Sequence, residues 1–162
     1  MIDQVAEEIN KADTIHLIGI GTDEIIALFL DWYLRIMGFN TICYTEGGFG
    51  FSNKFSAIKE KDLLIIGVCP RHLKDEKIAL EVARSKGTKI VSITSQQMSD
   101  VIMASDISLT VETKDTGFVN SYVPFMSLCN LILARVYEKD SDRLYKKLKE
   151  ISEFTNHFNP YV

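Results

Sequence analysis

The sequence has few cysteines, and none of them stand at metal-binding spacing. Cys43, Cys69 and Cys129 lie far apart, without a C-x-x-C pair. An odd, scattered set argues against a disulfide framework and against a zinc site, because both need cysteines that meet in pairs or groups. We therefore expect buried, reduced thiols in a cytoplasmic protein, and no metal.

The chain also lacks long apolar runs and an excess of positive charge. Charged residues interrupt its apolar stretches well before the roughly 18 residues that a membrane span needs, and no signal peptide opens it. Its formal net charge is -4, whereas domains that bind nucleic acid usually carry a basic face. We expect a soluble protein that by itself binds neither a membrane nor nucleic acid. With 46% hydrophobic residues among 162, it is long enough for one domain with a sizeable core.

Apolar strand-like segments alternate with helical patterns along most of the sequence. Strands are expected at 14–20, 40–45, 63–68, 88–94 and 107–112. Helices are expected near the start of the chain and at 25–37, 52–59, 74–86, 97–104 and 120–137. Strands that are apolar on both faces and alternate with helices are typical of a parallel sheet covered on both sides. The sequence therefore predicts a doubly wound α/β domain with a mainly five-stranded parallel sheet.

The last part of the sequence differs in composition. Charged residues dominate after Lys139, and Leu144, Leu148 and Ile151 form an apolar stripe with lysines opposite. We expect one α/β domain over residues 1–139, with its core at 14–137, followed by a C-terminal helix and tail over 140–162. The end, 156–162, is expected to be irregular.

Ligands of doubly wound sheets bind at the loops that leave the carboxyl ends of the strands, next to helix N-termini. This rule selects the loops at 19–24, 69–74, 95–99 and 113–121. The first loop lacks the third glycine of a dinucleotide site, so we expect no nicotinamide cofactor. Gly19 and Gly21 fit a tight turn. Asp23 fits the N-cap of the next helix, where its carboxylate would occupy the place of a phosphate.

The order of these motifs resembles the SIS (sugar isomerase) domain, which binds phosphorylated sugars in isomerases, in aminosugar synthesis and in bacterial regulators of the RpiR type. The resemblance covers about residues 14–137 and rests on IGIGTD at 18–23, ITS at 93–95 with Ser99, and DISL at 106–109. It implies a cradle of hydroxyl groups for phosphate. In this sequence it implies ligand contacts for Gly21, Thr22, Thr94, Ser95, Ser99 and Ser121.

One part of the pattern departs from the family. Where the family has a first-loop serine and a later S-x-S-G-x-T, this sequence has Asp23, and then Val68, Pro70 and Leu73. One branch of the RpiR-type regulators, however, has S-F-P-R-Y-S in this loop, which VCPRHL at 68–73 resembles. The same branch carries an aromatic-rich segment before the last helix, and TGFVNS at 116–121 is similar. The resemblance therefore points to the effector domain of an RpiR-type regulator.

Arg71 is the candidate that would replace the missing hydroxyl groups. Its planar guanidinium suits a phosphate or a carboxylate, and Pro70 suits the entrance to a helix. Alternatively, Arg71 pairs with one of its acidic neighbours, Asp75, Glu76 or Asp23. His72 is either a ligand contact or a histidine of the surface or of a dimer interface.

The other candidates also have structural interpretations. Ser95 or Ser99 could cap the helix that follows them, and Ser121 could cap the last helix. His16, inside the first strand, fits a core or interface histidine. Two carboxylates at strand ends could act as bases of an isomerase, although solvated loop carboxylates are commoner at such places; they are Glu46 and Glu112.

The sequence favours a ligand sensor over an enzyme. An aldose–ketose isomerase needs a base and an acid, and no pair of groups stands out for these roles. We expect a domain that binds a small anionic sugar or sugar phosphate, without a cofactor, as the effector-sensing part of a regulator. The alternatives are a stand-alone sugar-phosphate isomerase and a degenerate domain that only dimerises.

Two expectations concern partners. No helix-turn-helix domain precedes Ile2, so the chain is either an excised effector domain or a stand-alone relative, and contact with DNA would need such a domain. The SIS resemblance and the nearly all-round apolar helix at 25–37 imply a homodimer or a higher homo-oligomer.

Overall fold

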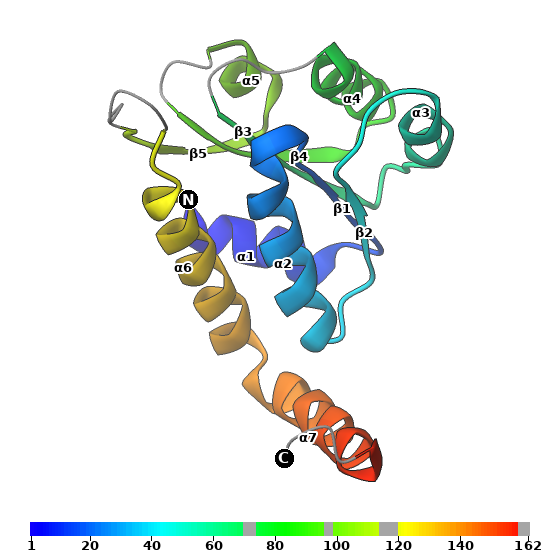
Figure 1. Ribbon diagram of the computed structural model, residues 1–162, viewed down its shortest axis with the longest axis vertical. Coiled ribbons are helices and arrows are strands. Elements are labelled where there is room, and N and C mark those ends of the chain that lie inside the picture. Colours follow the sequence, from blue (N-terminus) through cyan, green and yellow to red (C-terminus); the bar gives the residue numbers. More distant parts are fainter. Residues whose placement is uncertain (70–73, 96–98, 114–119, 159–162) are drawn as a thin grey trace.

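The structure is a computed structural model that describes residues 1–69, 74–95, 99–113 and 120–158 (Figure 1). Its centre is a five-stranded sheet in the order β2-β1-β3-β4-β5, with all neighbouring strands parallel. The strands are β1 (Ile15–Ile18), β2 (Thr41–Tyr44), β3 (Leu63–Val68), β4 (Lys89–Ser95) and β5 (Ile107–Val111). This order is one of the common doubly wound topologies. The predicted fold class is confirmed.

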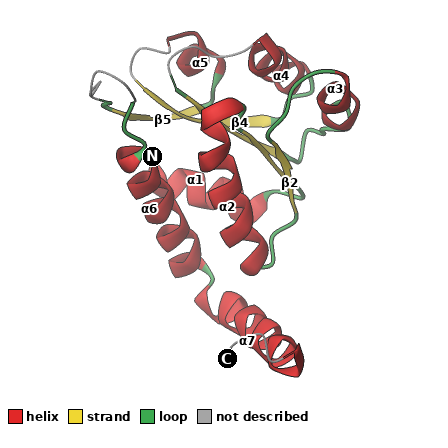
Figure 2. Ribbon diagram, in the orientation of Figure 1, coloured by secondary structure: helices red, strands yellow, loops and turns green. Residues whose placement is uncertain are grey.

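Helices cover both faces of the sheet (Figures 1 and 2). One face packs against α1 (Ile2–Lys11), α2 (Glu24–Ile36) and α6 (Val123–Lys139). The other packs against α3 (Phe49–Phe55), α4 (Lys74–Ser85) and α5 (Ser99–Ala104). A single turn of 3-10 helix, η1 (Gly21–Asp23), leads into α2.

Strand β3 shows why the strands of this sheet have continuous apolar sequences. Leu63 and Ile65 belong to the core cluster beneath α1, α2 and α6, whereas Leu64, Ile66 and Val68 belong to the cluster beneath α3, α4 and α5. Successive side chains of a strand point to opposite faces, and here both faces are covered. Burial of these side chains is the main contribution to the stability of the sheet.

Two predicted elements differ from the structure. The helix expected at 52–59 lies at Phe49–Phe55, because Gly48, with φ 85°, allows the turn into it and Phe51 and Phe55 bury one turn apart. The last helix, α7 (Ser141–Phe158), continues through Asn156 and His157, which were expected in an irregular tail. No proline or glycine interrupts its sequence before Pro160, so the helix has no reason to end earlier.

α7 extends from the far end of α6, away from the rest of the molecule (Figure 1). Leu144 at its start is buried, while Tyr145 and Phe154 are largely exposed. In the described parts of the chain, no helix combines the length and the apolar character that crossing a membrane would require.

Candidate functional site

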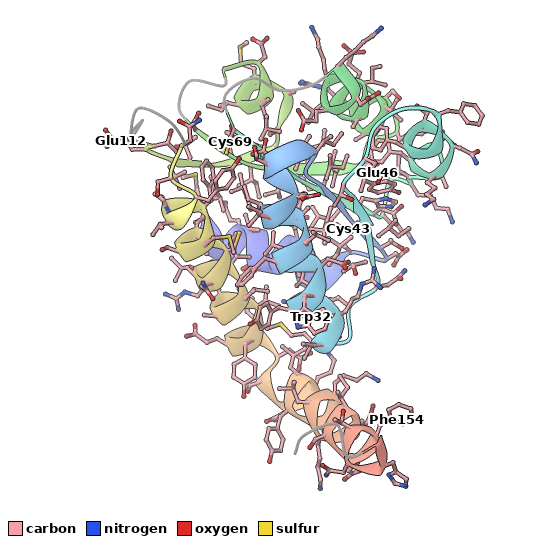
Figure 3. All side chains as sticks on the ribbon, viewed as in Figure 1. Trp32, Cys43, Glu46, Cys69, Glu112 and Phe154 are labelled. Atoms are coloured by element: carbon pink, nitrogen blue, oxygen red, sulfur yellow. The ribbon has the colours of Figure 1, made fainter. Side chains whose placement is uncertain are left out.

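The candidate site lies at the carboxyl edge of the sheet, where the chain order changes direction. From β1 the chain passes to β2 on one side and then to β3 on the other, so the connections after β1 and β3 leave toward opposite faces. Ligands of open α/β sheets bind outside this point. Figure 3 labels Cys69, which follows β3, next to the N-terminal end of α2.

The loop after β1 is wound tightly. A Cβ atom on Gly19 would lie 2.3 Å from the backbone oxygen of Asp23, so only glycine fits there. Gly21 has φ 69°, in the left-handed region that glycine adopts without strain. The predicted tight turn is confirmed, and it folds Asp23 back toward the sheet.

α2 also lies unusually close to the end of β3. Gly67 has no side chain where Ile26 of α2 packs, and a Cβ atom there would lie 2.9 Å from Ile26 Cγ2. This close approach brings the N-terminus of α2 to the end of β3. Asp23 and Cys69 can therefore meet.

Asp23 connects three segments that are far apart in the sequence. Its Oδ2 accepts a hydrogen bond from the backbone N–H of Cys69 at 3.0 Å, and its Oδ1 accepts one from the phenol of Tyr122 at 2.7 Å. The same phenol oxygen lies 2.8 Å from Thr22 Oγ1. Asp23 is only 7% exposed, so both charge-assisted bonds act away from bulk water.

Asp23 occupies the N-cap position of α2, as predicted, but the predicted capping hydrogen bond is wrong. Its side chain makes no capping hydrogen bond to α2. The donors at the end of β3 and at the start of α6 hold the carboxylate instead, and its backbone already belongs to η1. The carboxylate of Asp23 therefore links loops and does not cap α2.

Burial keeps the neighbouring groups of Asp23 protonated. It raises the pKa of the Cys69 thiol to about 12, and the charge of Asp23 adds to that effect. Burial also raises the pKa of the Tyr122 phenol, which Asp23 reinforces. At neutral pH Cys69 is thus a thiol and not a nucleophilic thiolate, and Tyr122 remains a hydrogen-bond donor.

Ser95, the last residue of β4, completes the described part of the site. It is 2% exposed, and its Oγ has no hydrogen-bond partner among the described residues. It follows Val91 and Ile93 on the face beneath α2 and α6, which is also the face of Cys69. Val68 and Thr94 pair across β3 and β4, so Cys69 and Ser95 are neighbours at the edge of the sheet. Asp23, Cys69 and Ser95 therefore lie near one another at the carboxyl edge of the sheet.

Comparisons with known proteins identify the family. The model of the SIS domain matches residues 8–135, most of the chain. The chain belongs to the SIS domain family.

Individual relatives agree with this assignment. The sugar isomerase domain of an RpiR transcription factor from Sphaerobacter thermophilus superposes with a TM-score of 0.89 and 28% identity, covering 94% of this chain and 85% of that one. The Vibrio vulnificus NanR protein complexed with ManNAc-6P has a TM-score of 0.86 at 18% identity, covering 99% of this chain and 61% of that one; at this identity the likeness concerns the fold.

A third relative is longer than this chain. An uncharacterized HTH-type transcriptional regulator of Clostridium perfringens is 27% identical over 154 residues, which cover 91% of this chain and 54% of that protein. The chain therefore spans about half the length of the curated relative that it matches.

Two hydroxyl candidates of this SIS domain have structural partners. Thr94 is fully buried, and its Oγ1 donates to the carbonyl oxygen of Val68 at 2.7 Å, which ties β4 to the end of β3. Ser121 Oγ accepts a weak 3.4 Å hydrogen bond from the N–H of Val123 at the start of α6, although the N-cap residue of that helix is Tyr122 and not Ser121. Ligand contact by either residue stays a prediction.

Several predicted residues fall outside what the structure describes. Arg71 and His72, with Pro70 and Leu73, lie outside the described residues, so their roles also stay predictions. Ser99 begins α5, but its side chain is not among those described. Of the acidic neighbours considered for Arg71, Asp75 accepts a 3.3 Å hydrogen bond from the N–H of Gly48.

Tyr122 is the residue of the site that sequence reasoning missed. Its position directly before α6, followed by a proline in the first turn of that helix, is the only signal that the sequence offers. Its partner Asp23 lies almost a hundred residues earlier, and no spacing rule connects the two.

The two strand-end carboxylates of the SIS domain lie far apart. Glu46 follows β2 and Glu112 follows β5, which are the two edge strands of the sheet (Figure 3). Neighbouring strands are about 4.8 Å apart, so four steps separate these positions by about 19 Å. Both residues are exposed. They cannot serve as an acid and base on the same small sugar.

His16 lies in a separate polar cluster on the other face of the sheet. Its Nε2 lies 3.3 Å from Asp62 Oδ2, and its Nδ1 lies 3.0 Å from the Tyr44 phenol oxygen. Because a carboxylate only accepts, Nε2 carries the hydrogen, and Tyr44 donates to Nδ1. Burial lowers the pKa of His16, while Asp62 opposes that shift. With 2% exposure, His16 is confirmed as a core histidine.

Proposed function

We propose that this chain is the effector-sensing SIS domain of an RpiR-type transcriptional regulator. The observation that carries the proposal is the similarity to the sugar isomerase domain of an RpiR transcription factor, which extends over 94% of this chain. The Clostridium relative supports it, because an HTH-type regulator has room for a second domain beyond the part matched here. DNA contact would then come from the other half of the full-length protein.

The proposed ligand is a small anionic sugar derivative, such as a sugar phosphate. NanR, which has the same fold, is complexed with ManNAc-6P. In this chain the carboxyl edge of the sheet carries Ser95, a buried hydroxyl without a hydrogen-bond partner in the part of the chain that the structure describes. A buried polar group that makes no hydrogen bond is unfavourable, so a ligand that pairs with Ser95 would gain free energy. We place the ligand at this edge, between the N-termini of α2 and α6.

The described residues give an isomerase less support. Glu46 and Glu112 are too far apart to share a substrate, and Tyr122 and Cys69 keep their protons at neutral pH. A regulator domain needs binding alone, which buried hydroxyl and backbone groups can supply.

The proposed assembly is a homodimer that buries the outer face of α2. Three large apolar side chains lie at helical spacing on that face and are exposed: Ile25, Leu28 and Trp32. Trp32 is 67% exposed and points away from the sheet (Figure 3). Contiguous exposed apolar side chains usually mark an interface. Sedimentation at tens of micromolar protein (roughly the range for stable association) should give a dimer, and a monomer would contradict this assembly.

Calorimetric titration tests the ligand class. Wild-type protein is titrated with hexose and hexosamine phosphates, and with the same sugars lacking phosphate as controls. At least one phosphorylated sugar should bind, and its unphosphorylated counterpart should bind more weakly. Ser95→Ala should weaken that binding, whereas Ser85→Ala, which removes an exposed hydroxyl at the far end of α4, should not. Absence of binding by every phosphorylated sugar would contradict the proposal.

A further inference from the structure

The hydrogen-bond donors around Asp23 are of the kind that bind phosphate in other proteins. The backbone N–H of Cys69 stands at the end of a strand, and the phenol of Tyr122 stands at the start of a helix. Strand ends and helix N-termini in doubly wound sheets supply such donors to anionic ligands. Here an internal carboxylate takes them both.

Asp23 is also held where an anion would be stabilised. It directly precedes α2, a helix of 13 residues, whose N-terminal dipole favours negative charge. The tight turn at Gly19 and the close approach at Gly67 fix its position from two sides. The carboxylate is thus a built part of the site and not a loosely placed surface charge.

Ser95 is an independent sign that a ligand group belongs beside this carboxylate. Its hydroxyl is buried and has no partner within residues 1–69, 74–95, 99–113 and 120–158, and it is the neighbour of Cys69 on the same face of the sheet. A ligand group that pairs with Ser95 therefore lies close to the negative charge of Asp23. A second anion there would be repelled, whereas a hydroxyl or an amino group would not.

Resting on the proposed function, we propose that Asp23 is a specificity-determining residue that acts as a built-in anion. The carboxylate of Asp23 fills the phosphate position beside β3. The ligand therefore presents a hydroxyl or amino group to Ser95 and Asp23, and the phosphate of the ligand lies elsewhere along the carboxyl edge of the sheet. Removal of the carboxylate frees the Cys69 N–H and the Tyr122 phenol for an external anion. The inference therefore predicts a gain of binding on mutation.

The experiment uses inorganic phosphate as the probe. The amide resonance of Cys69 is followed by NMR during phosphate titrations of wild type, Asp23→Asn and Asp23→Ser. Wild type should show no saturable shift of this amide. Asp23→Ser should bind phosphate roughly 10- to 100-fold more tightly than wild type, as expected for one or two charge-assisted hydrogen bonds. Asp23→Asn should gain less, because its amide still fills the space.

Two matched variants test where the phosphate binds. Asp31→Ser removes the same charge from α2, the helix that Asp23 precedes, at a place where Asp31 pairs with Thr41 and Arg35, and it should gain no phosphate binding. Tyr122→Phe, added to Asp23→Ser, should reverse part of the gain. Equal gains in the Asp31 and Asp23 variants would reduce the effect to net charge and overturn the proposal.

Further outcomes separate this inference from the proposed function. A folded Asp23→Ser protein without improved phosphate binding refutes the inference, even if wild type binds sugar phosphates. Phosphate binding by Asp23→Ser, with no sugar phosphate bound by wild type, supports the inference and refutes the proposed ligand class. If Asp23→Ser does not fold, two other results overturn the inference. One is a saturable phosphate-dependent shift of the Cys69 amide in wild type, and the other is no gain of phosphate binding in Asp23→Asn.

Discussion

Two buried polar clusters lie on opposite faces of the same sheet, and each contains a carboxylate and a tyrosine. In the inner cluster, His16 bonds to both Asp62 and Tyr44, beside the ring of Phe55 in α3. In the edge cluster, Asp23 and Tyr122 join the ends of three loops. The difference is that the edge cluster lies at the strand ends and beside an unpaired hydroxyl. A buried polar cluster indicates a binding site only when its position and an unsatisfied group both point to a ligand.

His16→Ala should have the largest effect on stability. The substitution removes a buried ring and leaves Asp62 and Tyr44 without their shared partner, so the free energy of unfolding should fall by about 3 kcal/mol. Urea denaturation measures this loss. The exposed His157→Ala serves as the control and should change the free energy of unfolding by less than about 0.5 kcal/mol. If His16→Ala lost ligand affinity but no stability, the inner cluster would be functional and the comparison would fail.

Tyr122→Phe should have a smaller effect on stability and a clear effect on binding. It deletes one hydrogen bond to a buried carboxylate, which is worth about 2 kcal/mol of unfolding free energy. The loops at the edge should then lose their fixed arrangement, so affinity for the sugar ligand should fall too. Tyr145→Phe, on the exposed part of α7, provides the control for both measurements. Unchanged affinity in Tyr122→Phe would separate the edge cluster from the ligand.

The pH dependence of stability should show the smallest of these effects, and it tests whether His16 is a core residue of the inner cluster. Burial holds the pKa of native His16 below its ordinary value of 6.5, so the unfolded chain takes up this proton at a higher pH than the native protein does. The contribution of neutral His16 to the free energy of unfolding is therefore complete above about pH 6.5. It falls as the pH drops toward the native pKa, by at most about 1.4 kcal/mol per pH unit. Urea denaturation at about pH 7.5 and 5.5 measures this. The pH dependence should shrink in His16→Gln, and an identical dependence would assign it to other groups.

The sequence predicts the strands better than it predicts the site. β3 lies at its predicted bounds, because Leu63–Val68 is a run without polar side chains that lies between helices on both faces of the sheet. The spacing of Gly19 and Gly21 likewise predicts the tight turn after β1, because that turn is local in the sequence. The Asp23–Tyr122 bond is different, since it joins groups that only the folded topology brings together. Local rules therefore assigned Asp23 to the nearest helix and gave Tyr122 no role.

Mapping the ligand onto the described residues tests the central claim most directly. The isotope-labelled domain is titrated with the tightest-binding sugar phosphate, and the amide shifts are followed by NMR. The account predicts saturable shifts at the carboxyl edge, at Thr22, Cys69 and Ser95, and none at His16 or Asp62. Shifts centred on the inner cluster, or on the pocket that α4 and α5 line around Leu80 and Val101, would contradict the account. So would the absence of saturable shifts with every sugar phosphate.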